Sequence, residues 1–343
     1  MVQCRVMTRT LTEVPDAVID ERKTIRFGSY RGAFPRVDLS HVSGPLTSRF
    51  RRKRWVYVIV VREPWVVTLA MVHLGYLSSA FIHLYDGRSR RFVQERTVIR
   101  TPLALRFGDL DEHRYARFIS KPLSVTVRRA NTNDATEPMV VSAKTSGALG
   151  IELEASLDPR TVPRSITAVA KIPGGLVNVT EKRGPFPVSG TLTAFGERID
   201  LDGGWGGYDS TFGVLARDTR WRWAFALGKD VHGEPFALNL VDGFVGEAEC
   251  AAFAFGDTHP LPEGRITFDR DRPLEPWRVG TPDGSVDLRF EPGAVLTEKR
   301  DYGVIATQFL QPTGRYFGKV KLGSRTLDID GAYGVAEDQA LKW

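Results

Sequence analysis

Apolar and polar residues alternate along most of this chain. From Ile151 to Leu157, four apolar positions are interleaved with two glutamates and a serine. A period of two residues is typical of a β-strand that buries one face. Comparable runs occur at residues 125–129, 221–227, 236–241, 265–269, 286–290 and 316–322. Since no stretch shows a long, capped helical period, the pattern predicts an all-β protein of antiparallel strands with few helices.

The turn residues support this fold class. Thirty-three glycines and twenty prolines are spread through the chain and separate the apolar runs. Many short strands with regular turns are typical of a β-barrel or a β-sandwich. The glycine patterns that hold phosphates between a strand and a helix are not found, which argues against a doubly wound nucleotide-binding fold.

Residues 64–84 form an uncharged, largely apolar stretch that is long enough to cross a bilayer as a helix. Its β-branched residues, the central Gly75 and the two histidines instead favour two strands around a turn. We therefore expect two strands of a protein core here, with a transmembrane helix as the alternative.

Two motifs occur twice. Thr180–Arg183 has the same sequence as Thr297–Arg300, and Gly196–Gly206 resembles Gly323–Gly334 with one residue inserted. In the second pair, Asp200, Asp202, Gly203, Trp205 and Gly206 correspond to Asp328, Asp330, Gly331, Tyr333 and Gly334. Such self-similarity indicates a repeated structural unit, and chance similarity between turn-rich strands is the alternative.

The length of 343 residues allows one large core or two ordinary ones. We place a boundary between residues 130 and 150, where residues 131–138 are polar and turn-rich. Residues 1–140 are then a basic segment that forms part of the first barrel, and residues 141–343 hold the repeated units.

Cysteine content and the start of the chain favour a reducing compartment. Cys4 and Cys250 are far apart in sequence, and neither belongs to a metal-binding or redox pattern. Residues 1–15 lack the apolar segment of a secretory signal. We expect a cytoplasmic protein.

The net charge of +6 is unevenly distributed. Residues 1–130 contain 24 Lys and Arg against 11 Asp and Glu, which makes this part strongly basic. The run Arg51–Arg54 is the densest cluster, and it suits either an anionic surface or solvated strand ends. We expect the cluster to be exposed, with no specific nucleic-acid partner.

Several longer motifs resemble an uncharacterised bacterial family, the domain-of-unknown-function 2804 family. The residues that carry this resemblance are Gly75-Tyr76, Asn178–Lys182, Tyr208–Gly213, Arg217–Ala224, Asn239–Phe244, Glu247–Glu249, Pro276–Arg278 and Glu337–Trp343. The family is in turn distantly similar to double-lipocalin proteins of the carotenoid hydratase and tocopherol cyclase type. The resemblance implies two lipocalin-like barrels, an apolar cavity, and acid-driven hydration or cyclisation of a hydrophobic small molecule.

The sequence departs from the family pattern at two positions. Phe212 and Gln339 stand where relatives often have histidine. If those histidines transfer protons in the relatives, this protein lacks them, which favours binding without turnover.

Protonation of an alkene or alcohol in an apolar cavity needs an acid whose pKa is raised by burial, beside aromatic walls. Asp209 and Glu249 are the candidate catalytic residues. Asp209 follows a glycine-rich turn and precedes an aromatic strand. The alternative for Asp209 is a carboxylate that caps backbone N–H groups of a turn.

Seven further residues are candidates for ligand binding: Tyr208, Trp221, Arg222, Trp223, Asn239, Glu337 and Asp338. The two tryptophans share one strand face and form either a pocket wall or ordinary core. Arg222 points the other way and needs Asp209 or Glu249 as its partner if it is buried. An interior Asn239 must bond to backbone or ligand.

Glu337 and Asp338 follow the later copy of the repeated motif, as Tyr208 and Asp209 follow the earlier one. Each repeat therefore places acidic residues at about the same point. The alternative is a structural role, in which the acids bind arginines at turns.

Other chemistries lack support in the sequence. The six histidines are scattered without the spacing of metal ligands, and no serine lies in a nucleophile-elbow motif. We predict no metal and no cofactor.

Three functions remain. The first is a carrier or sensor of a hydrophobic small molecule, and the second is a cofactor-free hydratase, cyclase or isomerase acting on a lipid-like substrate. The third is a peripheral adaptor at an anionic membrane or at nucleic acid, suggested by the basic N-terminal part. The oligomeric state is not specified by any sequence feature.

Overall fold

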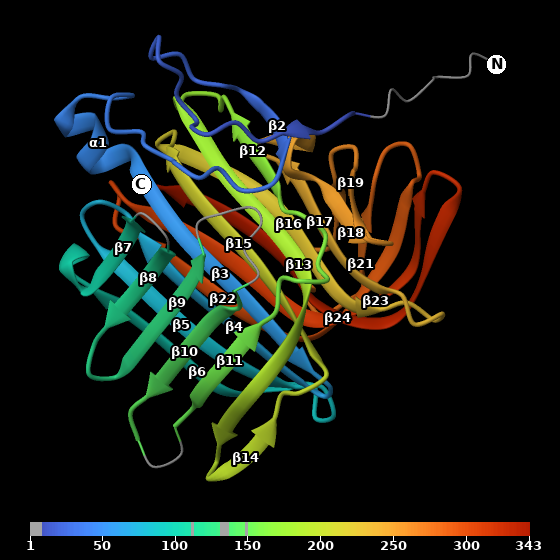
Figure 1. Cartoon of the computed structure of the whole chain (residues 1–343). Helices are drawn as coiled ribbons and strands as arrows, with labels where there is room; N and C mark the ends of the chain where they lie inside the picture. Colours follow the sequence, from blue (N-terminus) through green and yellow to red (C-terminus); the bar gives the residue numbers. More distant parts are fainter. Residues whose placement is uncertain (1–8, 111–112, 131–136, 148–149) are drawn as a thin grey trace.

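The computed structural model describes residues 9–110, 113–130, 137–147 and 150–343, and it shows two curled, almost wholly antiparallel sheets (Figure 1). Each sheet forms a half-barrel, so the predicted all-β class is confirmed. The helices are short: α1 (Pro45–Arg51) and the 3₁₀ turns η1 (Pro102–Ala104) and η2 (Gly246–Glu249).

The first sheet has the spatial order β6 (Arg91–Arg100), β5 (Ser78–Asp86), β4 (Trp65–His73), β3 (Arg52–Arg62), β15 (Gly204–Val214), β13 (Val177–Ala194), β11 (Glu152–Leu157), β10 (Met139–Thr145), β9 (Leu123–Ala130), β8 (His113–Ile119) and β7 (Leu105–Leu110). Strands β1 (Thr12–Glu13), β2 (Gly28–Arg31), β12 (Ile166–Ala170) and β14 (Glu197–Asp200) join it beside this path.

The second sheet has the order β19 (Asp257–Pro260), β18 (Ala251–Ala254), β17 (Pro235–Gly243), β16 (Asp218–Lys229), β24 (Arg325–Lys342), β23 (Ala306–Leu322), β22 (Val286–Asp301), β21 (Trp277–Gly280) and β20 (Arg265–Thr267). Both sheets have the same connectivity around their centre. In each one, a long early strand (β3 or β16) pairs with the last strand (β15 or β24), which pairs with the preceding long strand (β13 or β23).

This strand order shows which repeated motif marks equivalent positions. Gly196–Gly206 and Gly323–Gly334 each connect the last two long strands of their sheet, β13 with β15 and β23 with β24. The Thr-Glu-Lys-Arg motif lies on β13 and β22, which hold different positions in the two orders. Only the longer motif therefore marks equivalent strands, and the shorter one does not.

The two sheets meet later in the chain than the position we placed between residues 130 and 150. Part of that segment lies outside the described residues, but β9 and β10 on either side of it are paired in register. The first sheet continues to Val214, and the second begins at Asp218. The polar segment thus connects two neighbouring strands of one sheet.

Residues 64–84 form strands β4 and β5 around a turn, as expected. Gly75 lies in this turn with a φ of 90°, and a Cβ there would lie 2.0 Å from the Arg49 carbonyl oxygen. In the described part of the chain, no helix is long and apolar enough to cross a membrane.

The alternation of apolar residues has different consequences in different strands. In β11, Leu153, Ala155 and Leu157 are buried while the two glutamates are exposed. In β16, by contrast, Ala224 and Phe225 are both buried although they point to opposite faces. One face of β16 packs inside its own half-barrel and the other packs against the first sheet.

A glycine makes the close approach of the sheets possible. A Cβ on Gly207 of β15 would lie 2.2 Å from a ring carbon of Phe225 on β16. Because real Cβ contacts are never this short, any larger residue at this position must displace the aromatic ring or the strand.

The prediction that the Arg51–Arg54 cluster is exposed is wrong. Lys53 is fully buried, where its ammonium donates to the carbonyl oxygens of Phe50 and Leu74 and lies over the rings of Tyr76 and Trp343. Burial lowers the pKa of Lys53 to about 7.

The three arginines of the cluster also have structural contacts. Arg51 donates to the Leu215 carbonyl oxygen, and Arg52 and Arg54 lie over the ring of Phe212. The basic run therefore fastens distant segments of this chain to one another.

We predict that Gly207→Ala lowers the free energy of unfolding by about 1–3 kcal/mol, because it overpacks the contact with Phe225. Urea denaturation would measure the change. Gly44→Ala is the matched control, since a Cβ there has no neighbour within 4 Å. Equal stability of the two variants would contradict this account of the sheet contact.

Candidate functional site

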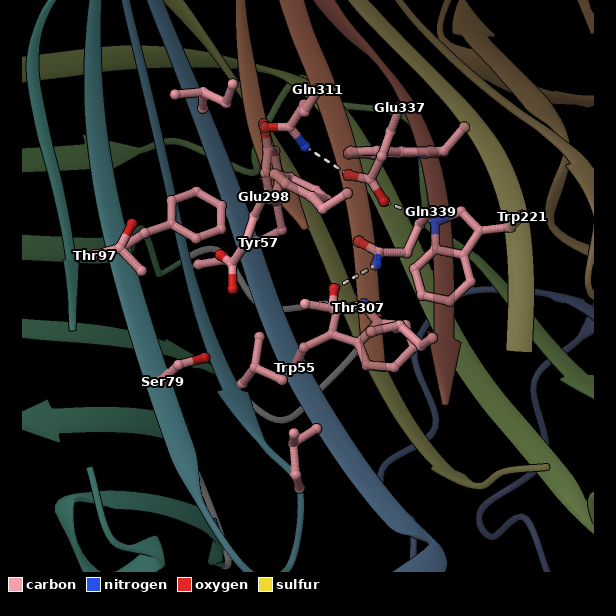
Figure 2. Close-up of a pocket in the computed structure, with 18 of the residues that line it drawn as sticks. Trp55, Tyr57, Ser79, Thr97, Trp221, Glu298, Thr307, Gln311, Glu337 and Gln339 are labelled. Carbon is pink, nitrogen blue, oxygen red and sulfur yellow. Dashed lines mark hydrogen bonds between the residues drawn. The ribbon is translucent and has the colours of Figure 1, made fainter. Parts of the chain in front are cut away.

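A cavity of about 670 Å³ lies between the two sheets. Its walls come from β3, β4, β5, β6, β13 and β15 on one side and from β16, β17, β22, β23 and β24 on the other (Figure 2). This cavity lies between the two half-barrels. Phe81 and His83 of β5 face it, whereas Ala80 and Ile82 pack inside the first sheet.

The first chemical centre of the cavity is an ion cluster. The Lys182 ammonium on β13 lies 2.8 Å from the Asp209 carboxylate on β15 and 3.6 Å from the Glu249 carboxylate in η2. All three side chains are almost fully buried. Because Glu249 follows strands of the second sheet, the cluster links the two sheets.

The pKa values in this cluster follow from burial and pairing. Burial alone would lower the pKa of Lys182, but the attraction of Asp209 and Glu249 outweighs it, so this pKa is raised. Burial also raises the pKa of Glu249, and Lys182 opposes part of that rise.

The second chemical centre is the carboxyl group of Glu337 on β24. It accepts hydrogen bonds from the Trp221 indole at 2.8 Å and from the Gln311 amide at 2.6 Å (Figure 2). Burial raises the pKa of Glu337 to about 7, although both hydrogen bonds act in the opposite direction. Near pH 7 this group is therefore protonated in about half of the molecules, and the protonated share grows as the pH falls.

The two centres occupy equivalent positions in the two sheets. Asp209 is as far beyond Gly206 as Glu337 is beyond Gly334. Asp209 is paired in register with Tyr57 of β3, as Glu337 is with Trp223 of β16.

Their neighbours are equivalent as well. The Trp55 indole approaches Asp209 at 3.4 Å, as Trp221 approaches Glu337. Lys182 is paired with Asp209, and the register of β23 and β24 places Gln311 opposite Glu337. Each sheet thus supplies one indole, one carboxyl group and one longer polar side chain.

The aromatic residues of the two sheets meet in this cavity. The rings of Trp55 and Trp221 are stacked with centroids 5.9 Å apart, and Tyr57 meets Trp223 edge to face at 5.1 Å. The Lys182 ammonium lies 5.3 Å from the Trp223 ring. These faces can stabilise positive charge that develops on a bound molecule.

A family model for "Domain of unknown function (DUF2804)" matches residues 9–343. The chain belongs to this family. No curated protein matches it.

Two solved structures are similar to this family member. CghA has a TM-score of 0.51 at 10% identity, covering 84% of this chain and 87% of CghA. Kievitone hydratase from Nectria haematococca has a TM-score of 0.49 at 10% identity, covering 96% of this chain and 98% of that one. At such identities the similarity to CghA concerns the fold alone, which is the all-β fold of two curled antiparallel sheets.

The structure brings five of the nine predicted site residues to the cavity. These are Asp209, Glu249, Trp221, Trp223 and Glu337. Asn239 lies behind the wall, where it accepts a hydrogen bond from the Trp223 indole and donates one to the backbone carbonyl of Glu249. Asn239 therefore supports the cavity wall from behind. Its amide binds backbone, which was one of the two partners expected from the sequence.

The other three predicted residues point away from the cavity. Arg222 contacts Asp338 at 3.3 Å and Asp242 at 3.5 Å, instead of Asp209 or Glu249. Asp338 also binds Arg270. Tyr208 lies on the opposite face of β15, against Arg129. Successive side chains of a strand point to opposite faces. Tyr208, Arg222 and Asp338 point away from the cavity because each is next in sequence to a cavity residue.

Sequence reasoning missed several residues of the site. Lys182 lies within a repeated motif but was not selected, and Gln311 and Trp55 belong to no motif that we recognised. Asp209 and Glu337 lie at the same distance beyond the repeated glycine motif. A comparison of the strands paired with them would have pointed to the indoles of Trp55 and Trp221. Gln339 lines the cavity and donates to Thr307, whereas Phe212 lies on the other face of the first sheet.

Other titratable groups near the cavity are held neutral. His83 is stacked on Phe81 at 4.5 Å, and burial lowers its pKa to about 3. The pKa of Tyr57 is raised well above its ordinary value, first by burial and then by Glu337. Burial raises the pKa of the Cys250 thiol to about 12, which makes it a poor nucleophile.

Within the described ranges, no group of His, Cys, Asp and Glu side chains is arranged to hold a metal ion. Cys4 lies outside those ranges. The absence of a metal and of a cofactor stays a prediction.

The raised pKa of Glu337 has a consequence for stability. The folded state binds this proton more tightly than the unfolded state, so the contribution is complete below pH 4.5 and is lost as the pH rises through about 7. As the pH rises from 4.5 to 8, the free energy of unfolding of the wild type should fall by about 3 kcal/mol more than that of Glu337→Gln.

Urea denaturation of both proteins between pH 4.5 and pH 8 would measure this difference. In the variant, the Gln311 amide can rotate to accept a bond from the new amide. Parallel pH profiles for the two proteins would show that Glu337 is ionised throughout.

Proposed function

We propose that this protein is a cofactor-free acid–base catalyst that hydrates, cyclises or isomerises an apolar small molecule held between the two sheets. The observation that carries the proposal is the arrangement of Glu337 and Asp209 on the same aromatic-walled cavity. Glu337 retains a proton near neutral pH, while Asp209 is the carboxylate of an ion pair with Lys182.

The chemistry follows from these two states. Glu337 donates its proton to one carbon of an alkene, and the other carbon becomes cationic beside Trp55, Trp221 and Trp223. Three outcomes are then available. Water attacks the cation while Asp209 accepts its proton, or Asp209 removes a proton from a neighbouring carbon. Alternatively an internal double bond attacks and closes a ring, and the new ring cation then loses a neighbouring proton to Asp209.

The walls define the class of substrate. Apolar and aromatic side chains line most of the cavity, and its volume accommodates a small molecule of drug or terpenoid size. Asp209 and Glu337 are near enough to interact electrostatically, so one reactive part of the ligand meets both groups while the rest is held mainly by apolar contact.

A carrier of the same kind of ligand is the second candidate. It is favoured by Gln339, an amide that lines the cavity where relatives often have histidine and that cannot transfer a proton. Turnover distinguishes the two functions, since a carrier releases its ligand unchanged.

The first experiment identifies the ligand by native mass spectrometry of protein purified from its own host. Incubation of that ligand in D₂O then tests for chemistry. Hydration adds one water, whereas cyclisation or isomerisation through proton transfer introduces solvent deuterium. Recovery of the ligand without either change would support the carrier.

We predict that Glu337→Gln lowers kcat by at least about a hundredfold while the ligand Kd changes little, because proton transfer occurs only in the transition state. Asp209→Asn should likewise reduce turnover more than affinity. Ligand binding is measured by quenching of tryptophan fluorescence.

Asp330→Asn is the matched control, since Asp330 is an exposed acid on the same strand as Glu337. Turnover by the wild type should decline as the pH rises through about 7, because Glu337 loses its proton there. Retention of full turnover by Glu337→Gln would exclude this residue as the acid.

A further inference from the structure

One end of the cavity opens among exposed apolar side chains. Ile99 and Tyr302 line the cavity and are 39% and 69% exposed, so the opening and the surface are continuous. Val304 in the same turn as Tyr302 is 67% exposed, and Leu103 in η1, just beyond Ile99, is 84% exposed. We call Ile99, Leu103, Tyr302 and Val304 the rim.

Several contacts hold the segments of the rim at the same end of the molecule. Lys342 donates to the Gly303 carbonyl oxygen at 2.8 Å, which fixes the turn after β22 to the end of β24. Arg217, just before β16, donates to the Val304 carbonyl oxygen at 2.8 Å. On the other side of the opening, Ser78 of β5 donates to the Thr101 carbonyl oxygen at 2.7 Å.

Helix α1 lies beside the same opening. Its residues Leu46 and Phe50 are 76% and 53% exposed, and the Phe50 ring lies 6.4 Å from Tyr76 in the turn between β4 and β5. The C-terminus lies next to α1 (Figure 1), where Lys53 contacts the Trp343 ring. Exposed apolar side chains therefore border the opening on more than one side.

The charges around the rim are mainly basic. Arg49, Arg100, Arg217 and Arg300 are exposed there. Three acids lie nearby, Glu298, Asp301 and Asp218. Glu298 forms an ion pair with Arg300 at 2.9 Å, so Arg49, Arg100 and Arg217 outnumber the two acids that remain. Basic residues around exposed apolar and aromatic side chains complement an anionic lipid surface.

We propose that the rim docks on the surface of an anionic lipid bilayer, so that the cavity exchanges its ligand directly with the membrane. The proposal rests on the proposed function only in that the ligand is apolar. An apolar molecule partitions into bilayers, and an opening that faces lipid spares it a passage through water.

Sedimentation with vesicles tests the docking without any ligand present. Wild-type protein should bind vesicles of phosphatidylcholine with phosphatidylglycerol more tightly than vesicles of phosphatidylcholine alone, and added salt should weaken the binding. The double variant Tyr302→Ser/Val304→Ser should bind at least about tenfold more weakly, because two apolar side chains no longer insert.

Phe195→Ser/Val231→Ser is the matched control. Phe195 and Val231 are 41% and 55% exposed. They lie in the turns that follow β13 and β16, at the end of the sheets opposite to the rim. This control should bind within about twofold of the wild type, and Arg49→Ser/Arg100→Ser should lose the preference for anionic vesicles. Circular dichroism would verify that each variant is folded.

Two results would overturn the proposal: no binding of the wild type to anionic vesicles, or equal loss in the rim variant and its control. Because the assay contains no substrate, its outcome is independent of the proposed chemistry. Loss of turnover in Glu337→Gln without vesicle binding would contradict the docking alone, and vesicle binding without turnover would contradict the catalysis alone.

Discussion

The burial of the Lys182 ammonium between two sheets is the constraint on which the site depends. A buried, unpaired charge is prohibitive, so Lys182 requires the carboxylates of Asp209 and Glu249 beside it. Asp209 comes from the first sheet and Glu249 from η2 in the second half of the chain. The ion cluster can form only when the half-barrels are correctly opposed, which ties the folding of the chain to the geometry of the cavity.

The two carboxyl groups differ because their neighbours differ. Asp209 and Glu337 have equivalent positions, and each is approached by a tryptophan indole. A cation, Lys182, lies opposite the first, whereas a neutral amide, Gln311, lies opposite the second. An ammonium attracts the charged form of a carboxyl group, whereas the amide offers only a hydrogen bond, and burial then raises the pKa of Glu337 to about 7. The difference between Lys182 and Gln311 thus gives two equivalent carboxyl groups different roles, Asp209 as the base and Glu337 as the acid.

The sequence predicted features that depend on local pattern. Alternation identified the strands, and the glycine-rich repeat marked equivalent turns near Asp209 and Glu337. Features that depend on contacts between distant segments were missed. The buried state of Lys53 requires Trp343 and Tyr76, and the partner of Arg222 depends on the register of β16 and β24. The polar segment after Ala130 suggested a domain boundary because a loop between neighbouring strands has the same composition as a linker.

The matching strand orders also bear on the origin of the site. Had a single half-barrel once associated with a second copy about a twofold axis, the cavity would have contained two identical pairs of indole and carboxyl group. Identical subunits cannot give those pairs different partners. Fusion of the copies into one chain removes this restriction, because a mutation at one position then changes one side alone. The asymmetry of Lys182 and Gln311 is the kind of specialisation that a homodimer cannot evolve and a tandem duplication can.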